Sequence, residues 1–157
     1  MRLHIIPVDG RKAWPMFAPH HYLTAKYTGH RAWIVTLDDG TAVGFVSIIA
    51  FPNGHFDNGW REHRTVVLPD FQGLGIGPRL SNWAGEHVIK VVGGRFFSRT
   101  SHPRMGEYRE RSPLWRPTTK NRRKRSTAEV TSSKDMAMKW TGDTRQTYAH
   151  EYVGDQP

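Results

Sequence analysis

Runs of apolar residues divide the first half of the chain into strand-like segments. Residues 3–8 and 32–37 each predict a strand, and residues 42–51 predict a third that is apolar on both faces, as expected for a central strand. The sequence Asp38-Asp39-Gly40 between the last two is typical of a hairpin turn. Residues 60–68 predict a fourth strand.

Helical spacing is strongest in the middle of the chain. One apolar stripe at helical intervals contains Ile76, Leu80, Ala84, Val88 and Val91. This stripe predicts a helix that begins near Gly75, with Pro78 tolerated in its first turn. Residues 11–22 predict a short helical or irregular segment broken by two prolines.

The remaining pattern completes a mixed architecture. Residues 95–100 predict a strand, residues 102–111 a short helix and residues 147–153 a terminal strand. No internal repeat is present. The order of elements predicts an α+β fold with helices around a sheet, and 157 residues predict a single domain, residues 1–157.

A glycine-rich loop joins the fourth strand to the long helix. Glycines at 73, 75 and 77 let the backbone approach a ligand, and the unpaired N–H groups of the first helical turn point toward it. This combination predicts an anion site, with a pyrophosphate as the expected ligand. A P-loop would need Lys and then Ser or Thr after Gly77, and the glycine spacing differs from that of a dinucleotide fingerprint.

The pattern Gln-x-x-Gly-x-Gly at residues 72–77 resembles the acetyl-CoA pyrophosphate motif of the GNAT superfamily of N-acetyltransferases. The resemblance implies a GNAT-like, mostly antiparallel twisted sheet flanked by helices, and acetyl-CoA or another acyl-CoA as cofactor. In that superfamily the strand before the loop pairs its backbone with the pantetheine arm, and the splayed junction with the next strand holds the thioester. The alternative is a glycine-rich connection that binds no ligand. The implied cofactor-binding residues are Val66, Val67, Leu68, Gln72, Gly73, Leu74, Gly75, Ile76 and Gly77.

The same resemblance implies candidate catalytic residues. Tyr108 stands seven positions after Ser101, where the superfamily often has an Asn followed by the Tyr that protonates the leaving thiolate. The general base could be Glu62 or His63, which point to opposite faces of their strand, so that at most one faces the substrate. His63 is preferred because imidazole titrates near neutral pH.

A second resemblance is narrower. Four short motifs, at residues 20–23, 60–64, 98–103 and 112–116, resemble a GNAT branch similar to the Mom DNA-modification proteins of bacteriophages. It implies modification of adenine N6 in DNA. The active-site candidates added by this resemblance are His20, His21, Tyr22 and Arg99.

Charge is concentrated in one segment. The chain carries a net charge of +9, and residues 104–125 hold nine Lys and Arg against two Glu, which is +7 of that total. A basic loop around residues 116–127 predicts contact with nucleic acid, in particular double-stranded DNA, although such runs also occur as solvated loops. The predicted nucleic-acid-binding residues are Arg99, Arg116, Lys120, Arg122, Arg123, Lys124 and Arg125.

Composition narrows the remaining possibilities. The chain has no cysteine, and no histidine spacing indicates a metal site, so none is expected. No signal peptide or apolar run of about 20 residues occurs, which predicts a cytoplasmic protein (the host cytoplasm if phage-encoded) with no membrane partner. The expected function is acyl transfer to DNA adenine. The alternatives are a protein or small-amine N-acetyltransferase and a non-catalytic nucleic-acid-binding relative.

Overall fold

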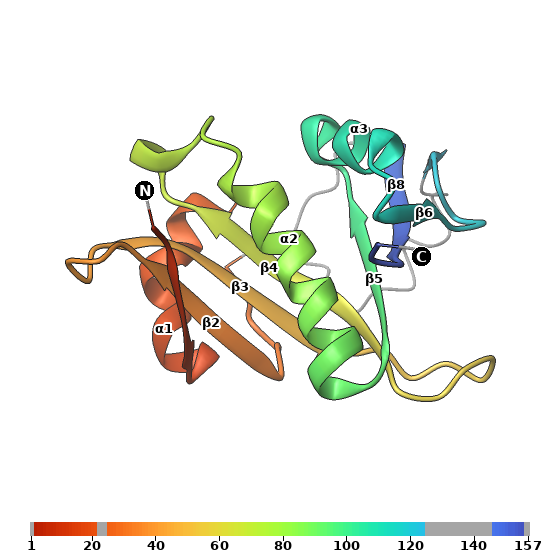
Figure 1. Ribbon diagram of the computed structural model, residues 1–157, viewed down its shortest axis with the longest axis horizontal. Helices are drawn as coiled ribbons and strands as arrows, with labels where there is room; N and C mark the ends of the chain where they lie inside the picture. Colours follow the sequence, from red (N-terminus) through yellow and green to blue (C-terminus); the bar gives the residue numbers. More distant parts are fainter. Residues whose placement is uncertain (1, 22–24, 125–145, 156–157) are drawn as a thin grey trace.

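The computed structural model describes residues 2–21, 25–124 and 146–155, and these form one open sheet with helices on both faces (Figure 1). The sheet has eight strands in the order β1-β2-β3-β4-β5-β8-β6, with β7 paired to β8 off this path. The strands are β1 (His4–Val8), β2 (Arg31–Thr36), β3 (Ala42–Ala50), β4 (Gly59–Val67), β5 (Arg95–Thr100), β6 (Trp115–Pro117), β7 (Arg123–Lys124) and β8 (Gln146–Tyr152). The helical elements are α1 (Gly10–Phe17), η1 (Ala18–His20), η2 (Pro69–Phe71), α2 (Ile76–His87), η3 (Val88–Val92) and α3 (Pro103–Arg111).

One parallel pair interrupts an otherwise antiparallel sheet. Only three residue pairs join β4 to β5, between Gly59–Arg61 and Arg95–Phe97. Beyond this short ladder the two strands diverge, as Figure 1 shows. The sheet therefore consists of a half formed by β1 to β4 and a half formed by β5, β8, β6 and β7.

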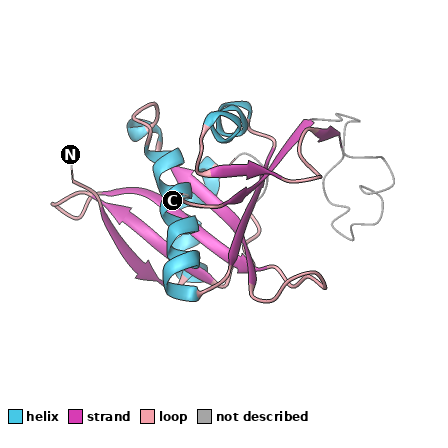
Figure 2. Cartoon of the chain, turned by 45° about the vertical axis from the view of Figure 1, so that its right-hand side comes forward, coloured by secondary structure: helices cyan, strands magenta, loops and turns pink. Residues whose placement is uncertain are grey.

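Helices cover the sheet unequally. Helices α2 and α3 lie on one face, called here the α2 face, and α1 lies on the opposite face, the α1 face (Figures 1 and 2). Two buried clusters pack under α2, around Val88 and Leu80. A third packs Trp14 and Phe17 of α1 against Phe45 of β3. Both faces of β3 are thus buried, as its sequence predicts.

The predicted helix changes its winding before it ends. Regular α-helix stops at His87, and residues Val88–Val92 form a π-helix closed by a hydrogen bond from the Gly93 N–H to the Val88 carbonyl. The wider turn rotates Val91 away from the sheet, and its side chain is 69% exposed. The prediction that Val91 continues the buried stripe is therefore wrong, whereas Val88 is buried.

The predicted basic loop contains two short strands. β6 pairs with β8 from Trp115 to Pro117, and β7 pairs with β8 through two residues. The prediction of a loop around residues 116–127 is wrong for both strands, since the ladder with β8 outweighs the weak local preference of two or three residues. Residues 125–127 lie outside the described residues.

The predicted α+β fold is confirmed, with a mixed, mostly antiparallel sheet. No helix in the described ranges is long and apolar enough to cross a membrane.

Candidate active site

The glycine loop leaves an open backbone surface at the start of α2. Gly73 and Gly75 have positive φ angles of 82° and 72°, which L side chains rarely adopt. A Cβ atom at either position would meet nothing within 4 Å. Gly75 is the N-cap of α2, and no side chain caps the first N–H groups of the helix. This is the geometry of an anion site.

The loop side chains contribute little to this surface. Ile76 is 1% exposed and packs in the core, so only its backbone can face a ligand. A Cβ on Gly77 would lie 4.0 Å from Met105 Sδ of α3, which places the tip of α3 beside the first turn of α2. Leu74 is 57% exposed.

The backbone groups of β4 point alternately to β3 and to the open edge where β4 and β5 separate, which is called here the gap. The Leu68 N–H donates to the Val43 carbonyl of β3 at 2.8 Å, and by alternation the Val66 groups also face β3. The Val67 carbonyl instead faces the gap, where it accepts a hydrogen bond from Gln72 Nε2 at 2.9 Å. Strand register therefore directs the backbone groups of Thr65 and Val67 to the open edge and those of Val66 and Leu68 to β3.

A β-bulge rearranges the side chains next to the gap. The register of β3 against β4 shifts at Ser47 and Ile48, so that one residue of β4, His63, is extra. Glu62 points to the α2 face, where it contacts Ser98 of β5. His63 and Arg64 both point to the α1 face, where they contact residues 26–28. The prediction that Glu62 and His63 lie on opposite faces is confirmed.

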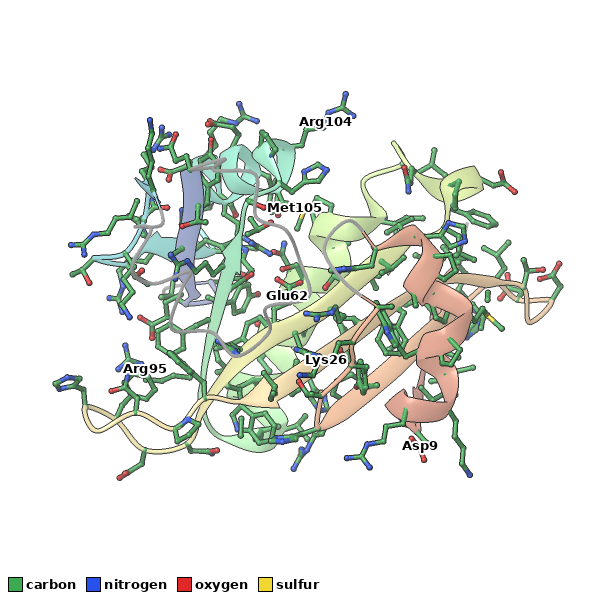
Figure 3. All side chains as sticks on the ribbon, turned by 180° about the vertical axis from the view of Figure 1, so that it is seen from behind. Asp9, Lys26, Glu62, Arg95, Arg104 and Met105 are labelled. Atoms are coloured by element: carbon green, nitrogen blue, oxygen red, sulfur yellow. The ribbon has the colours of Figure 1, made fainter. Side chains whose placement is uncertain are left out.

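Glu62 lies where β4 and β5 separate (Figure 3). Its carboxylate forms a 2.6 Å ion pair with Arg109 of α3, and the two side chains are 9% and 1% exposed. Burial acts to raise the pKa of Glu62, but the charge of Arg109 and the hydroxyls of Ser98 and Thr65 outweigh it and hold the pKa below its usual value. A buried, ion-paired carboxylate of this kind is a poor proton acceptor, which argues against Glu62 as the general base.

His63 and His21 form part of an aromatic cluster on the α1 face. The ring of Trp14 stacks on Tyr27 at 5.8 Å, His21 meets Trp14 edge-on at 5.6 Å, and His63 meets Tyr27 at 5.2 Å. Burial, and then the charge of Arg64, lower the pKa of each histidine to about 4. Both imidazoles are therefore neutral at pH 7. His63 Nε2 accepts a hydrogen bond from the Thr28 N–H at 3.1 Å.

Tyr108 lies between α3 and α2. Its hydroxyl oxygen accepts a 2.7 Å hydrogen bond from Asn82 Nδ2, and Asn82 Oδ1 accepts one from Trp115 Nε1 at 2.8 Å. The indole can only donate, so it fixes the orientation of the Asn82 amide, which in turn must donate to Tyr108. The phenolic proton of Tyr108 thus remains available for another acceptor.

The other candidates are scattered. Ser101 lies in the connection between β5 and α3, Tyr22 lies outside the described residues, and His20 is exposed at the end of η1. The residues that sequence reasoning missed are Thr65, Ser81, Asn82, Ser98 and Arg109. Of these only Ser98 lies in one of the short motifs, at residues 98–103, and it is the fold that brings the five together. Among the described residues no cluster of His, Asp or Glu could hold a metal ion.

The predicted nucleic-acid-binding residues separate into two groups. Arg116 pairs with Glu151, Arg122 lies near Glu107 and Glu110, and Arg99 donates to Thr147. Acidic or polar neighbours therefore engage these three. Lys120, Arg123 and Lys124 are exposed on and before β7, and Arg125 lies outside the described residues.

Comparisons with known proteins confirm the GNAT-like fold that the sequence predicts. Residues 4–105 match the model of the acetyltransferase (GNAT) family. The spermidine/spermine N-acetyltransferase SpeG from Vibrio cholerae has a similar structure, with a TM-score of 0.65 at 11% identity over 98% of this chain and 92% of that chain. The IAA acetyltransferase from Bacillus cereus gives a TM-score of 0.60 at 13% identity, covering 96% of this chain and 99% of the other. No curated protein sequence matches the chain.

Proposed function

Because the chain belongs to the acetyltransferase (GNAT) family, we propose that it transfers an acyl group from acyl-CoA to an amine bound on the α1 face, beside His63. The observation that carries this proposal is the separation of β4 from β5 next to an open glycine loop. An extended chain could pair with the free edge of β4 after the strands separate, and the glycine loop would bind the anion at the end of that chain.

The residues present fit an acyl-CoA. Backbone groups of Thr65 and Val67 face the gap and could pair with the amides of a pantetheine arm. The left-handed Gly73 and Gly75 and the N-terminus of α2 would hold the diphosphate. The bound thioester supplies the activated acyl group.

Two side chains are proposed for proton transfer. Tyr108 has a free phenolic proton for the departing thiolate. His63 would accept a proton from the amine, after exchanging its hydrogen bond to the Thr28 N–H for one to the substrate. An imidazole with a pKa of about 4 is a weak base, so positioning of the amine contributes more than proton removal.

The acceptor that we propose first is a small-molecule or protein amine. The family itself supports this class, and two of the similar structures are named for acetylation of spermidine or spermine and of IAA. A panel of polyamines, aromatic amines and lysine peptides would identify the acceptor. Since the chain has no cysteine, release of the CoA thiol can be followed with a thiol reagent without background from the protein.

The first experiment is a pair of measurements on the intact protein. A thermal-shift titration with acetyl-CoA and free CoA tests donor binding, because a ligand that binds only the folded state raises Tm. Thiol release over the amine panel tests transfer. Binding with transfer to an amine supports the proposal. Absence of binding to any CoA thioester overturns it, and salt-dependent nucleic-acid binding in that case would identify a non-catalytic nucleic-acid-binding relative.

A second candidate function is modification of DNA, with adenine N6 as the Mom-like acceptor. The observation that favours it is the group of exposed cations on and before β7, Lys120, Arg123 and Lys124. Cations of this kind bind phosphates with little sequence preference. Mass spectrometry of nucleosides after incubation with duplex DNA and acyl-CoA would reveal a modified adenine. Unmodified nucleosides, with acylation of a small amine or peptide, would exclude this function.

A further inference from the structure

Glu62 occupies the first position of β4 that has no backbone partner on β5. The parallel ladder ends at the pair Arg61 and Phe97, and the next residues on the two strands are Glu62 and Ser98. Their side chains replace the missing backbone contact, because Ser98 Oγ donates to Glu62 Oε2 at 2.5 Å. A side-chain hydrogen bond therefore joins the two strands at the point where they separate.

The same carboxylate connects this point to both helices of the α2 face. Thr65 Oγ1 donates to Glu62 Oε1 at 2.5 Å, which fixes the carboxylate along β4. Arg109 Nη2 of α3 donates to Glu62 Oε2 at 2.6 Å and to Ser81 Oγ of α2 at 2.8 Å. We call these five residues the Glu62 cluster. It joins β4, β5, α2 and α3, the four elements that border the gap.

The Glu62 cluster is not the arrangement expected if its only role were to stabilise the fold. A buried ion pair is often no more stabilising than apolar residues of the same volume, because both charges lose their hydration. Arg109 also leaves two of its buried donor atoms, Nε and Nη1, without a hydrogen-bond partner, while its guanidinium lies over the Trp115 ring at 4.6 Å. Unsatisfied buried groups of this kind are unusual and call for a functional explanation.

We propose that Glu62 and Arg109 are positioning residues, which set the separation of β4 and β5 and thereby the place of the acyl donor. This inference rests on the proposed function only in identifying the gap as the donor site. The geometry of the gap itself can be measured without any substrate.

The first experiment measures the gap directly. The chain has no cysteine, so Asp70→Cys and Arg104→Cys would place one spin label on η2 and one on α3, both at exposed positions on the open side of the gap. Ser98→Ala removes the link to β5 but leaves the ion pair with Arg109 intact. We expect a broader and longer distance distribution in Ser98→Ala than in the parent protein, and an unchanged one in the control Ser112→Ala, a half-buried serine after α3.

The second experiment separates positioning from catalysis. In Ser98→Ala and Glu62→Gln, we expect the Kd for CoA and the KM for acyl-CoA to rise by about tenfold, with the shape of the pH profile unchanged. Arg109→Lys should recover part of the affinity lost in Arg109→Gln, since Lys retains the charge but not the planar fork. If Glu62→Gln fails to fold, Ser98→Ala still decides the question.

Two outcomes would overturn the inference. One is an unchanged label distance and CoA affinity in Ser98→Ala. The other is loss of the pH dependence of transfer in Glu62→Gln with unchanged CoA affinity, which would make Glu62 the base instead. A protein that binds CoA but acylates no amine would refute the proposed function and leave the label measurement decisive for the inference.

Discussion

Tyr108 is able to act as an acid because its neighbour Asn82 donates a hydrogen bond to it and does not accept one from it. The Asn82 amide is oriented by Trp115, so the phenol accepts one hydrogen bond and keeps its own proton. We expect Tyr108→Phe to lower kcat by about 100-fold, within the range typical of a lost general acid, and to leave the KM for acyl-CoA unchanged. Steady-state assays of thiol release would measure this. Tyr148→Phe, which removes a hydroxyl bonded to Glu107, is the matched control and should retain full activity.

The neutral state of His63 has a kinetic consequence. Burial and the charges of Arg64 and Arg61 lower the pKa of His63 to about 4. A base with that pKa is already deprotonated above pH 5.5, so kcat/KM should be level from pH 5.5 to 8 when the acceptor itself does not titrate there. His63→Asn should lower kcat/KM by about tenfold at every pH in this range. An acid limb near pH 6.5 that disappears in His63→Asn would show that the imidazole titrates normally and would refute this account.

The loop between β4 and α2 depends on its glycines for shape as much as for access. Gly75 has a φ of 72°, and a side chain in the left-handed region costs about 1–2 kcal/mol. Gly75→Ala should therefore lower the free energy of unfolding by about that amount and also weaken CoA binding. Gly40→Ala is a matched control, because Gly40 has a φ of 85° and equally open space but lies in the hairpin between β2 and β3. Denaturation and CoA titration of both variants should show the same loss of stability and a loss of affinity in Gly75→Ala alone.

Local sequence predicted the elements whose signal is both long and periodic. The strand at residues 95–100 and the helix at 102–111 occur within one residue of the predicted bounds, because apolar spacing and prolines define them locally. β6 and β7 were missed because two or three residues carry no period, and they form only against β8. The π-helix at the end of α2 was missed for a related reason, since its i to i+5 hydrogen bond leaves no local pattern.

The candidate site also has one part that the sequence could predict and one part that it could not. The glycine loop could be predicted, because its function lies in the backbone of consecutive residues. The Glu62 cluster could not, because Ser81, Ser98 and Arg109 approach Glu62 from three other elements. The bulge at His63, which puts His63 and Arg64 on one face, is a property of the pairing with β3 and not of β4 alone.

The molecule as a whole is two half-sheets joined over a short parallel ladder. The backbone contributes three residue pairs to this junction, and α2, α3, the Glu62 cluster and aromatic contacts such as Phe56 with Phe97 add further connections. An acyl-CoA bound between β4 and β5 would contact both halves. Ligand binding and the cooperativity of folding are therefore expected to be linked at the same place.

Acid should weaken this assembly well above the pH at which carboxylates titrate. The folded pKa values of His21 and His63 are lowered from 6.5 to about 4, and burial also lowers the pKa values of His87 and His150. As the pH falls below about 6.5, the unfolded chain binds protons that the folded chain does not, so stability is complete above that pH and is lost toward pH 4. We expect Tm to decrease steadily between pH 7 and pH 5.

The ion-paired carboxylates affect the stability of the fold only at lower pH. The pKa values of Glu62 and Glu151 are held below 4.5 by their arginine partners and hydrogen bonds against the opposing effect of burial, so their contribution is lost only below about pH 4.5. A decrease between pH 7 and 5 is therefore a property of the histidines. His63→Asn should make this decrease smaller, since His21, His87 and His150 still contribute, and His55→Asn, at an exposed loop position, should leave it unchanged. Equal Tm values at pH 7 and pH 5 would contradict this prediction. They would mean that the buried imidazoles accept protons in the folded protein, and that water reaches the aromatic cluster on the α1 face well enough to hydrate their charge.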